Sequence, residues 1–319
     1  MTPPLDDILD RLHVVALPMR VKFRGITVRE VALIDGPAGW GEFGAFAEYE
    51  PPEASHWLAA ALESAYCELP QPLRDCIPIN ATVPAVDAER VPEVLARFPG
   101  ARTAKVKVAE PGQTLADDVA RVEAVRALIP TVRVDANGGW SVDQAVEAAR
   151  ALGALEYLEQ PCATVAELAA VRRRIDTPVA ADESIRKAED PLAVKAAGAA
   201  DIAVLKVAPL GGVSALLKIA EQIGIPVVVS SAIDSAVGIA TGLRAAAALP
   251  DLQHACGLGT GSLFVDDVTD PAETPAQKDG YLPVQSIAPD PARLRALAAS
   301  PQRRQWWIER IKVCHRLLA

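Results

Sequence analysis

The sequence has few of the residues from which zinc sites and disulfide frameworks are built. It contains four histidines and five cysteines among 319 residues, and no two cysteines form a CxxC pair. The histidines, at positions 13, 56, 254 and 315, never stand at the spacing that places two metal ligands on one helix face. These absences argue against a zinc site and against a disulfide-stabilised secreted domain.

Basic and membrane-spanning segments are also lacking. The net charge is −9 with a pI of about 5.1, and the sequence offers no basic face of the kind that a nucleic-acid backbone requires. No apolar run approaches the roughly 18 residues of a membrane span, and the first residues are acidic where a signal peptide is basic. We therefore expect a cytoplasmic protein with no nucleic-acid or membrane partner. Its oligomeric state is left open.

Two kinds of pattern divide the chain. Residues 21–43 alternate apolar and polar side chains on both sides of a Gly-Pro turn, which predicts an antiparallel sheet, and a helix is expected over 52–68. A turn-rich segment ends near residue 77. Beyond it, short β-branched runs alternate with Ala-rich amphipathic segments, which is typical of βα units. The expected strands are 79–83, 103–108, 132–135, 157–159, 179–182, 202–207, 226–231 and 253–257.

These elements predict an α/β fold, a (β/α)7β TIM-type barrel over residues 78–263. An α+β capping domain would come from residues 1–77, and residues 264–319, which include a terminal helix over 301–318, would pack back on it. Among the barrel helices, 115–128 and 141–152 keep apolar residues on one face, and Ser141 with Gln144 matches a capping box. An open doubly wound sheet is the competing fold, but no GxGxxG follows a strand.

Five ionisable residues stand at the ends of successive predicted strands. They are Lys107, Asp135, Glu159, Asp182 and Lys206, separated by 28, 24, 23 and 24 residues, about one strand and one helix each time. Parallel barrel strands end at one rim, so these five side chains should converge there. Lys105 shares the strand face of Lys107, because side chains alternate with a period of two. Taken alone, each of these residues could instead be a charge that faces solvent at the end of a strand. Lys105 and Lys107 could instead form ion pairs with the neighbouring acids.

Three close carboxylates repel one another unless a cation holds them ionised. Asp135, Glu159 and Asp182 offer hard oxygen ligands, which favour Mg2+ or Mn2+. Lysines on either side of such a site can act as general acids and bases.

The segments that contain these residues resemble the enolase superfamily, in its muconate-lactonizing-enzyme branch. The segments are KVK at 105–107, DANGGW at 135–140, LEQP at 158–161, ADES at 181–184 and VLKVAPLGG at 204–212. GWGEFGAF at 39–46 is similar to the capping-domain motif of that branch. VVVSSAIDSAVGIA at 227–240 and HACGLGTGSLF at 254–264 resemble the actinobacterial o-succinylbenzoate synthases of menaquinone biosynthesis.

The resemblance implies a lyase that dehydrates 2-succinyl-6-hydroxy-2,4-cyclohexadiene-1-carboxylate to o-succinylbenzoate. Asp135, Glu159 and Asp182 would bind Mg2+, and the substrate carboxylate would lie on that ion as an enediolate forms. Lys107 would remove the adjacent proton and protonate the departing hydroxyl, while Lys206 would act from the opposite face. Lys105 would support Lys107 electrostatically.

Weaker candidates surround the rim. Those for substrate binding are Arg24, Ser230, Ser231, Asp234, Gly257 and Ser262, and Asn137 is expected to be a turn residue beside Asp135. An N-acylamino-acid racemase or dipeptide epimerase of the same superfamily would need the same two lysines. A Schiff-base aldolase acting through Lys206 and a non-catalytic barrel protein are the more distant alternatives.

Overall fold

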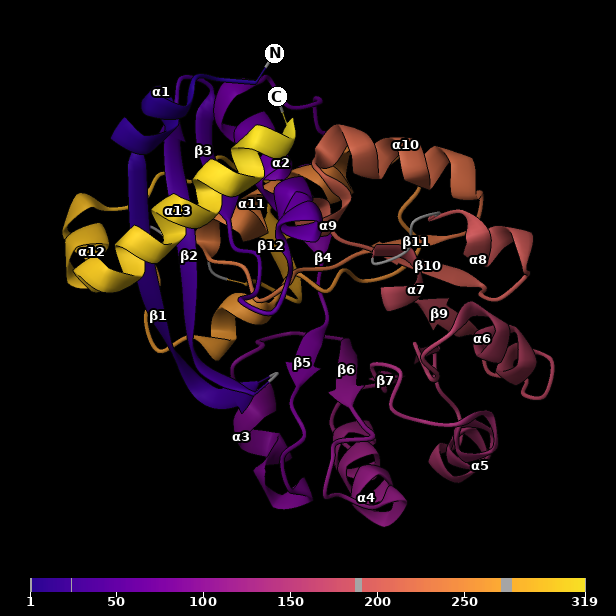
Figure 1. The fold of residues 1–319 in the computed structure, drawn as a ribbon. Helices are drawn as coiled ribbons and strands as arrows, with labels where there is room; N and C mark the ends of the chain where they lie inside the picture. Colours follow the sequence, from indigo (N-terminus) through magenta and orange to yellow (C-terminus); the bar gives the residue numbers. More distant parts are fainter. Residues whose placement is uncertain (1, 24, 187–190, 271–276, 319) are drawn as a thin grey trace.

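A computed structural model describes residues 2–23, 25–186, 191–270 and 277–318. It has a small capping unit beside a larger αβ unit (Figure 1). The capping unit contains a three-stranded antiparallel meander, β1 (Leu12–Phe23), β2 (Ile26–Gly36) and β3 (Gly39–Phe43), as its alternating pattern predicts. Helices α1 (Leu5–Asp10) and α2 (Pro51–Tyr66) complete it, and α2 begins one residue before the expected start.

The contact of α2 with the capping sheet depends on two glycines. A Cβ at Gly36 would overlap the backbone carbonyl of Ala65, and one at Gly41 would overlap that of Ala61. Both alanines are buried on the sheet-facing side of α2. Helix and sheet therefore approach more closely than any larger side chain at these strand positions would allow.

The larger unit is a curled sheet of seven parallel strands, which confirms the expected barrel architecture. In sheet order the strands are β11 (Val227–Val229), β10 (Ile202–Leu205), β9 (Val179–Ala181), β8 (Leu158–Glu159), β7 (Thr131–Asp135), β6 (Thr103–Lys107) and β5 (Ala81–Val83). Each strand pairs with the strand of the neighbouring βα unit. Both faces of the sheet are buried, so β9, β10 and β11 are apolar runs, whereas β6 and β7 alternate apolar residues with charged ones.

The expected eighth strand forms only two parallel bridges, Ser230 with Gly257 and Ile79 with Cys256. Backbone bonds support both bridges: Gly257 N–H donates to Val229 O at 2.8 Å, and Asn80 N–H donates to Cys256 O at 3.0 Å. Residues 256–257 thus connect the two edges of the curled sheet. They are too few to make a ladder, which explains why the predicted run 253–257 does not appear as a strand.

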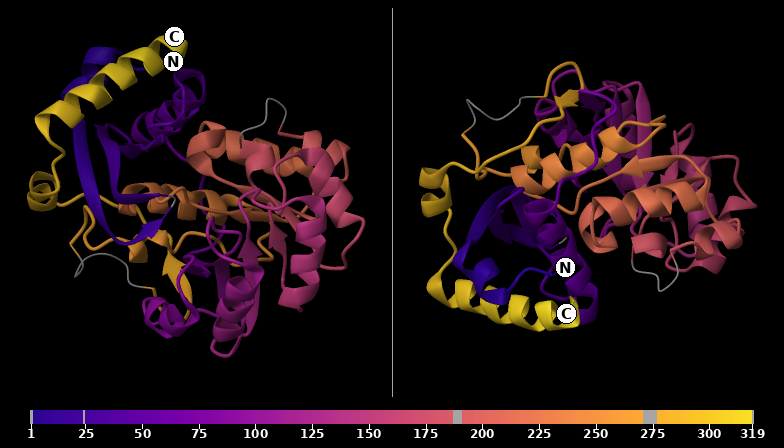
Figure 2. Two further views of the ribbon diagram at one scale, coloured as in Figure 1. Left: turned by 60° about the horizontal axis from the view of Figure 1, so that its bottom comes forward. Right: turned by 90° about the horizontal axis from the view of Figure 1, so that it is seen from above.

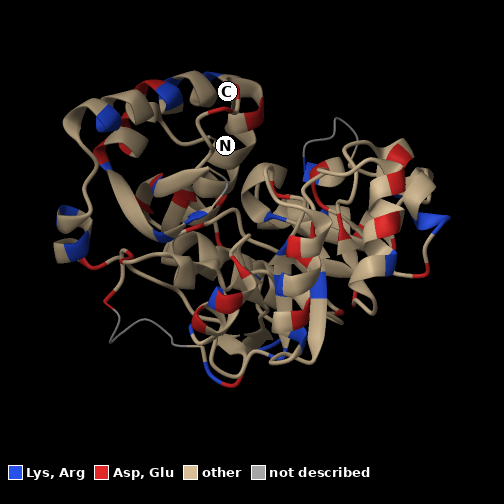
Figure 3. Ribbon diagram, turned by 90° about the horizontal axis from the view of Figure 1, so that it is seen from below, with Lys and Arg blue, Asp and Glu red and all other residues tan. Residues whose placement is uncertain are grey.

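Helices surround the curled sheet, most of them on its outside and some at its rim. They are α3 (Val91–Leu95), α4 (Leu115–Arg126), α5 (Val142–Leu152), α6 (Val165–Arg172), α7 (Glu183–Arg186), α8 (Ala193–Ala196), α9 (Val207–Leu210), α10 (Val213–Ile223) and α11 (Ala236–Ala248), with 3-10 turns η1 (Ala88–Arg90) and η2 (Thr260–Leu263). The Ser141–Gln144 capping box is present at the start of α5. Acidic and basic side chains are interspersed along these outer helices (Figure 3).

The C-terminal segment returns to the capping unit, as expected. Strand β12 (Tyr281–Pro283) pairs with β4 (Cys76–Pro78), and α12 (Pro291–Ala296) leads into α13 (Pro301–Leu318). On α13, the indole N–H of Trp307 donates to Glu30 of β2 at 3.0 Å, and the Trp307 ring packs edge-on against Phe43. The two ends of the chain lie together (Figure 2), where the Thr2 hydroxyl donates to Leu318 O. Among the described residues, no helix is long and apolar enough to cross a membrane.

Candidate active site

Strand register brings the predicted residues to one rim of the curled sheet. In the parallel ladders, Lys107 of β6 pairs with Asp135 of β7, and Asp135 pairs with Glu159 of β8. Asp182 directly follows β9, and Lys206 directly follows β10. The sheet order places the three carboxylate strands between the two lysine strands. The spacing in the sequence therefore translates into a row of acids with a lysine at each end.

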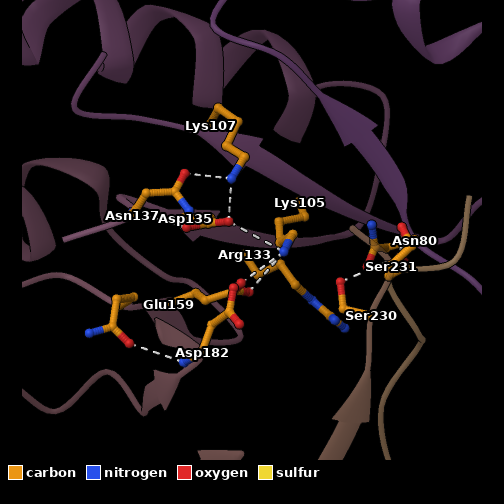
Figure 4. A network of polar contacts seen from close by, with 12 residues as sticks. Asn80, Lys105, Lys107, Arg133, Asp135, Asn137, Glu159, Asp182, Ser230 and Ser231 are labelled. Atoms are coloured by element: carbon orange, nitrogen blue, oxygen red, sulfur yellow. Dashed lines mark hydrogen bonds and ion pairs between the residues drawn. The ribbon is translucent and has the colours of Figure 1, made fainter. Parts of the chain in front are cut away.

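The three lysines form ion pairs with the acids. Lys107 Nζ lies 2.5 Å from Asp135 Oδ2, and Lys206 Nζ lies 2.5 Å from Asp182 Oδ2. Lys105 Nζ stands between two carboxylates, 2.8 Å from Glu159 Oε1 and 3.3 Å from Asp135 Oδ2 (Figure 4). All three carboxylates are buried, and the lysines are nearly so. Buried charges in this number are tolerated because they are paired.

Burial and neighbouring charge act in opposite directions on the acids. Burial and the negative charge of Asp135 raise the pKa of Glu159 to about 7. Burial alone would also raise the pKa of Asp135, but the positive charges of Lys107 and Lys105 hold it well below its usual range. The pKa of Asp182 is likewise low, because the two cations that contact it outweigh the effect of burial. Of the three acids, Glu159 is thus the one whose neutral form is favoured by its surroundings.

The lysines differ in the same way. Burial lowers the pKa of Lys206, and the nearby charge of Arg186 lowers it further, although Asp182 opposes both. For Lys105, burial would lower the pKa, but the negative charges of Glu159 and Asp135 together outweigh it and raise the pKa. Lys105 is therefore a fixed ammonium, whereas Lys206 is the more readily deprotonated of the two. This division suits Lys105 to electrostatic support and Lys206 to proton transfer.

A second layer of polar side chains lies beneath the row inside the curled sheet. Arg133, which shares the strand face of Asp135, is fully buried and donates to the Tyr157 hydroxyl at 2.8 Å and to Ala255 O at 2.9 Å. Its Nε donates to Glu156, which also contacts His254. This layer ties the β7 and β8 strands to the segment that bridges the sheet edges, and so supports the rim from below.

Two neighbours of the row, Gln160 and Arg186, were not singled out by the sequence. Gln160 has a positive φ of 38°, and its amide oxygen accepts from Asp182 N–H at 3.0 Å, which orients that strand end. Arg186 donates from Nε to Asp182 Oδ1 at 2.9 Å and from its second terminal nitrogen to Glu183. The sequence could have indicated the ion pair between Arg186 and Asp182, because the two residues are four positions apart, which is one helical turn.

The candidate substrate residues divide into two groups. Ser230, Ser231 and Gly257 line the same small cavity as the lysines, and the Ser231 hydroxyl lies 2.6 Å from that of Thr260, which the sequence did not indicate. Asp234 and Ser262 are outside this cavity. The Asp234 carboxylate accepts from Ala232 N–H below the capping sheet, and the Ser262 hydroxyl donates to Gly259 O.

Two further expectations concern the rim. Arg24 lies outside the described residues. Asn137 has a positive φ of 46°, as a turn residue can, but its side-chain oxygen also accepts from Lys107 Nζ at 2.6 Å. Asn137 therefore both turns the chain after Asp135 and contacts a proposed catalytic lysine.

The carboxylate row fits a divalent cation by its chemistry. Asp135, Glu159 and Asp182 supply buried hard oxygen ligands from adjacent strands, and burial together with the charge of Asp135 raises the pKa of Glu159. As the side chains stand, the lysines occupy the space between them, and no group of three or more His, Cys, Asp or Glu in the described part of the chain has its atoms gathered as a metal site. A cation here would have to take over ion pairs that the lysines now make.

Two family models match this chain. The model described as enolase C-terminal domain-like matches residues 88–289, and that described as enolase N-terminal domain-like matches residues 14–65. The first match includes six of the seven strands of the curled sheet, β6 to β11, and the second includes most of the capping meander and of α2.

Close relatives match nearly the whole chain. An o-succinylbenzoate synthase of Mycolicibacterium smegmatis is 75% identical over 99% of this chain and 98% of its own. One of Mycobacterium tuberculosis is 73% identical over 99% of this chain and 97% of its own. The resemblance seen in the motifs is thereby confirmed.

Solved structures share the fold at low identity. A muconate lactonizing enzyme of Pseudomonas fluorescens, in complex with muconolactone, superposes with a TM-score of 0.77 at 22% identity, covering 91% of this chain and 98% of that one. An N-succinyl Arg/Lys racemase of Bacillus cereus gives 0.74 at 19% identity, covering 91% and 97%. These two similarities support the assignment of the fold and nothing further.

Proposed function

The chain belongs to the enolase superfamily and, within it, to the o-succinylbenzoate synthases, and on this premise we propose that it dehydrates 2-succinyl-6-hydroxy-2,4-cyclohexadiene-1-carboxylate to o-succinylbenzoate in menaquinone biosynthesis. The single observation that supports this most is the near-complete match to relatives of that name. The rim chemistry agrees, because the reaction needs a base, an acid and positive charge around one carboxylate.

Membership of the enolase superfamily implies use of a divalent metal ion. We propose Mg2+, with Mn2+ as a substitute, held by Asp135, Glu159 and Asp182. When bound, the ion supplies positive charge that stabilises the negative charge developing on the substrate carboxylate as the adjacent proton leaves. Lys105 would then be released from its two carboxylates and would face Lys107, whose base form it would favour by charge repulsion.

The proton transfers are assigned to the lysines. Lys107, as the free amine, takes the proton from the carbon that bears the carboxylate. The electron pair of that C–H bond forms the new ring double bond as the C–O bond to the hydroxyl breaks. Lys107 returns the same proton to the departing hydroxyl, so that water leaves from the face where the base stands. Lys206 lies at the other end of the row, where its ammonium stabilises the charge from the opposite face.

Substrate recognition beyond the carboxylate is proposed for the far side of the cavity. Ser230, Ser231 and Gly257 lie there on the end of β11 and on the bridging segment. Their hydroxyl and backbone groups could donate to the succinyl carboxylate. Phe23, at the end of β1, lines the cavity on the capping side. Lys107 Nζ lies over the face of its ring, 5.5 Å from the ring centroid.

The test is turnover by the purified protein. With Mg2+ present, we expect the cyclohexadiene substrate to give the aromatic product, seen by its ultraviolet absorption. A parallel incubation with single enantiomers of N-succinyl amino acids in D2O reports racemisation through α-deuterium incorporation. Deuterium incorporation without aromatic product would replace the proposal with a racemase, since the same two lysines could perform both reactions.

A further inference from the structure

A continuous chain of hydrogen bonds joins Lys107 to Lys206 and includes one member of the carboxylate row, Asp182. Lys107 Nζ donates to Asn137 Oδ1 at 2.6 Å, and Asn137 Nδ2 donates to Glu183 Oε1 at 3.2 Å. Arg186 donates to that same oxygen at 2.5 Å and, through Nε, to Asp182 Oδ1 at 2.9 Å. Asp182 Oδ2 then accepts from Lys206, which closes the path from one lysine to the other.

Arg186 is the branch point of this chain. Its remaining terminal nitrogen donates to the hydroxyl of Tyr49 at 3.1 Å, so the guanidinium contacts three acceptors at once. Tyr49 belongs to the segment between β3 and α2 of the capping unit, 137 positions away in sequence. Arg186 is therefore the point at which the capping unit reaches the lysines through hydrogen bonds.

The Tyr49 ring is itself held in place. It is buried and packs edge-on against Phe46 and at a tilt against Trp57, within 6 Å between centroids in both cases. The hydroxyl is consequently fixed by the aromatic cluster of the capping unit and not by Arg186 alone. A rigid acceptor on one side and two carboxylates on the other determine where the guanidinium plane lies.

We infer that Arg186 is a positioning residue that orients Asp182 and Glu183 at the rim and couples their placement to the docked capping unit through Tyr49. The inference rests on the proposed function for the identity of the reaction. Its physical basis is the shape of the guanidinium, whose planar fork can hold Tyr49, Glu183 and Asp182 at fixed angles. A lysine at this position would carry the same charge but only one nitrogen. A single ammonium nitrogen cannot contact three acceptors that lie in this arrangement.

The experiment compares Tyr49→Phe with Tyr66→Phe. Both variants lose one phenolic hydroxyl of the capping unit, but the Tyr66 hydroxyl donates to Asp7, away from the curled sheet. Because a bond to a charged group is lost, we expect Tyr49→Phe to lower kcat about tenfold with KM changed less than about twofold, and Tyr66→Phe to leave both unchanged. Equal kcat in Tyr49→Phe and the wild type would overturn the inference.

Arg186→Lys and Arg186→Met separate position from charge. Both should lose kcat to a similar extent, whereas full recovery in Arg186→Lys would show that charge suffices and would refute a positioning role. A double-mutant cycle of Tyr49→Phe and Arg186→Met, followed by thermal unfolding, measures the contact without any substrate. We expect the two shifts in Tm to be less than additive. If the wild type turned over neither the cyclohexadiene nor an N-succinyl amino acid, the proposed function would fail. Strictly additive shifts in Tm would reject the link between Tyr49 and Arg186 whatever the reaction is.

Discussion

The carboxylate of Glu42 in the capping sheet accepts hydrogen bonds from Ser235, the residue that caps α11 on the curled sheet. The Ser235 backbone N–H lies 3.0 Å from Glu42 Oε2, and Gly238 N–H lies 3.2 Å from the same oxygen. Glu63 of α2 makes a similar contact with the start of α10, where it accepts from Ser214 N–H at 3.1 Å. Acids of the capping unit thus satisfy the open N–H groups of two barrel helices, which fixes the cap over the rim.

Glu42 predicts a pH dependence of stability. Burial and the charge of Asp234 raise its pKa from 4.5 to about 8, although Ser235 and Arg29 oppose the shift. Between these two pH values the folded protein holds a proton that the unfolded chain has released, so the unfolding free energy falls as pH rises. Asp267 shifts the same way, to about 6. We therefore expect Glu42→Gln to flatten the decline of Tm between pH 6 and 8.

The control for this prediction is Glu48→Gln, an exposed glutamate of the same unit. It should keep the slope of the wild type in the same Tm series. Parallel slopes for Glu42→Gln and the wild type would mean that Glu42 is ionised throughout this range.

The two rim lysines predict a loss of turnover. Lys107→Ala and Lys206→Ala should each lower kcat by at least about a hundredfold, because general acids and bases act in the transition state. Circular dichroism and Tm should show that both variants fold. Lys195→Ala, which removes an exposed lysine on α8, serves as the matched control. Wild-type turnover in either rim variant would remove that lysine from the mechanism.

Metal removal distinguishes the proposed lyase from a Schiff-base enzyme. Dialysis against EDTA should abolish formation of the aromatic product, and Mg2+ should restore it. Borohydride added during turnover should leave the mass of the protein unchanged, since Lys206 is paired with Asp182 and has no nucleophilic role in the proposed reaction. Activity that survives chelation together with a trapped adduct would favour the aldolase-like alternative.

Gly41 predicts a stability effect that is separate from the chemistry. In Gly41→Ala the new methyl group would overlap the Ala61 carbonyl of α2, so the helix has to move off the sheet. We expect a loss of about 1–3 kcal/mol in the free energy of unfolding, measured by urea denaturation. Gly261→Ala is the control, because no atom lies within 4 Å of its added Cβ. Equal stability of the two variants would show that α2 is not held in close contact.

The barrel and its rim could be predicted because they depend on local patterns. The alternation of β-branched and amphipathic segments specifies βα units, and the regular spacing from Lys107 to Lys206 places each charge at a strand end. The eighth run at 253–257 was overestimated, because a sequence of strand-like residues does not reveal that only two of them find partners. Asp234, at the end of the seventh strand, and Ser262, in a Gly-rich rim loop, stay predictions for substrate binding, and in the structure both side chains make local hydrogen bonds to the backbone.

By itself, the sequence determined the βα periodicity, the order of the three acids and two lysines, and the family motifs around them, since each of these lies within one unit of chain. Only the tertiary structure decided which charges pair. The insertion of Lys105 between Asp135 and Glu159 depends on side-chain reach across two strands. The contact of Arg186 with Tyr49 joins residues 137 positions apart. No local pattern encodes such contacts, because they exist only when separate elements pack and bury their charges together.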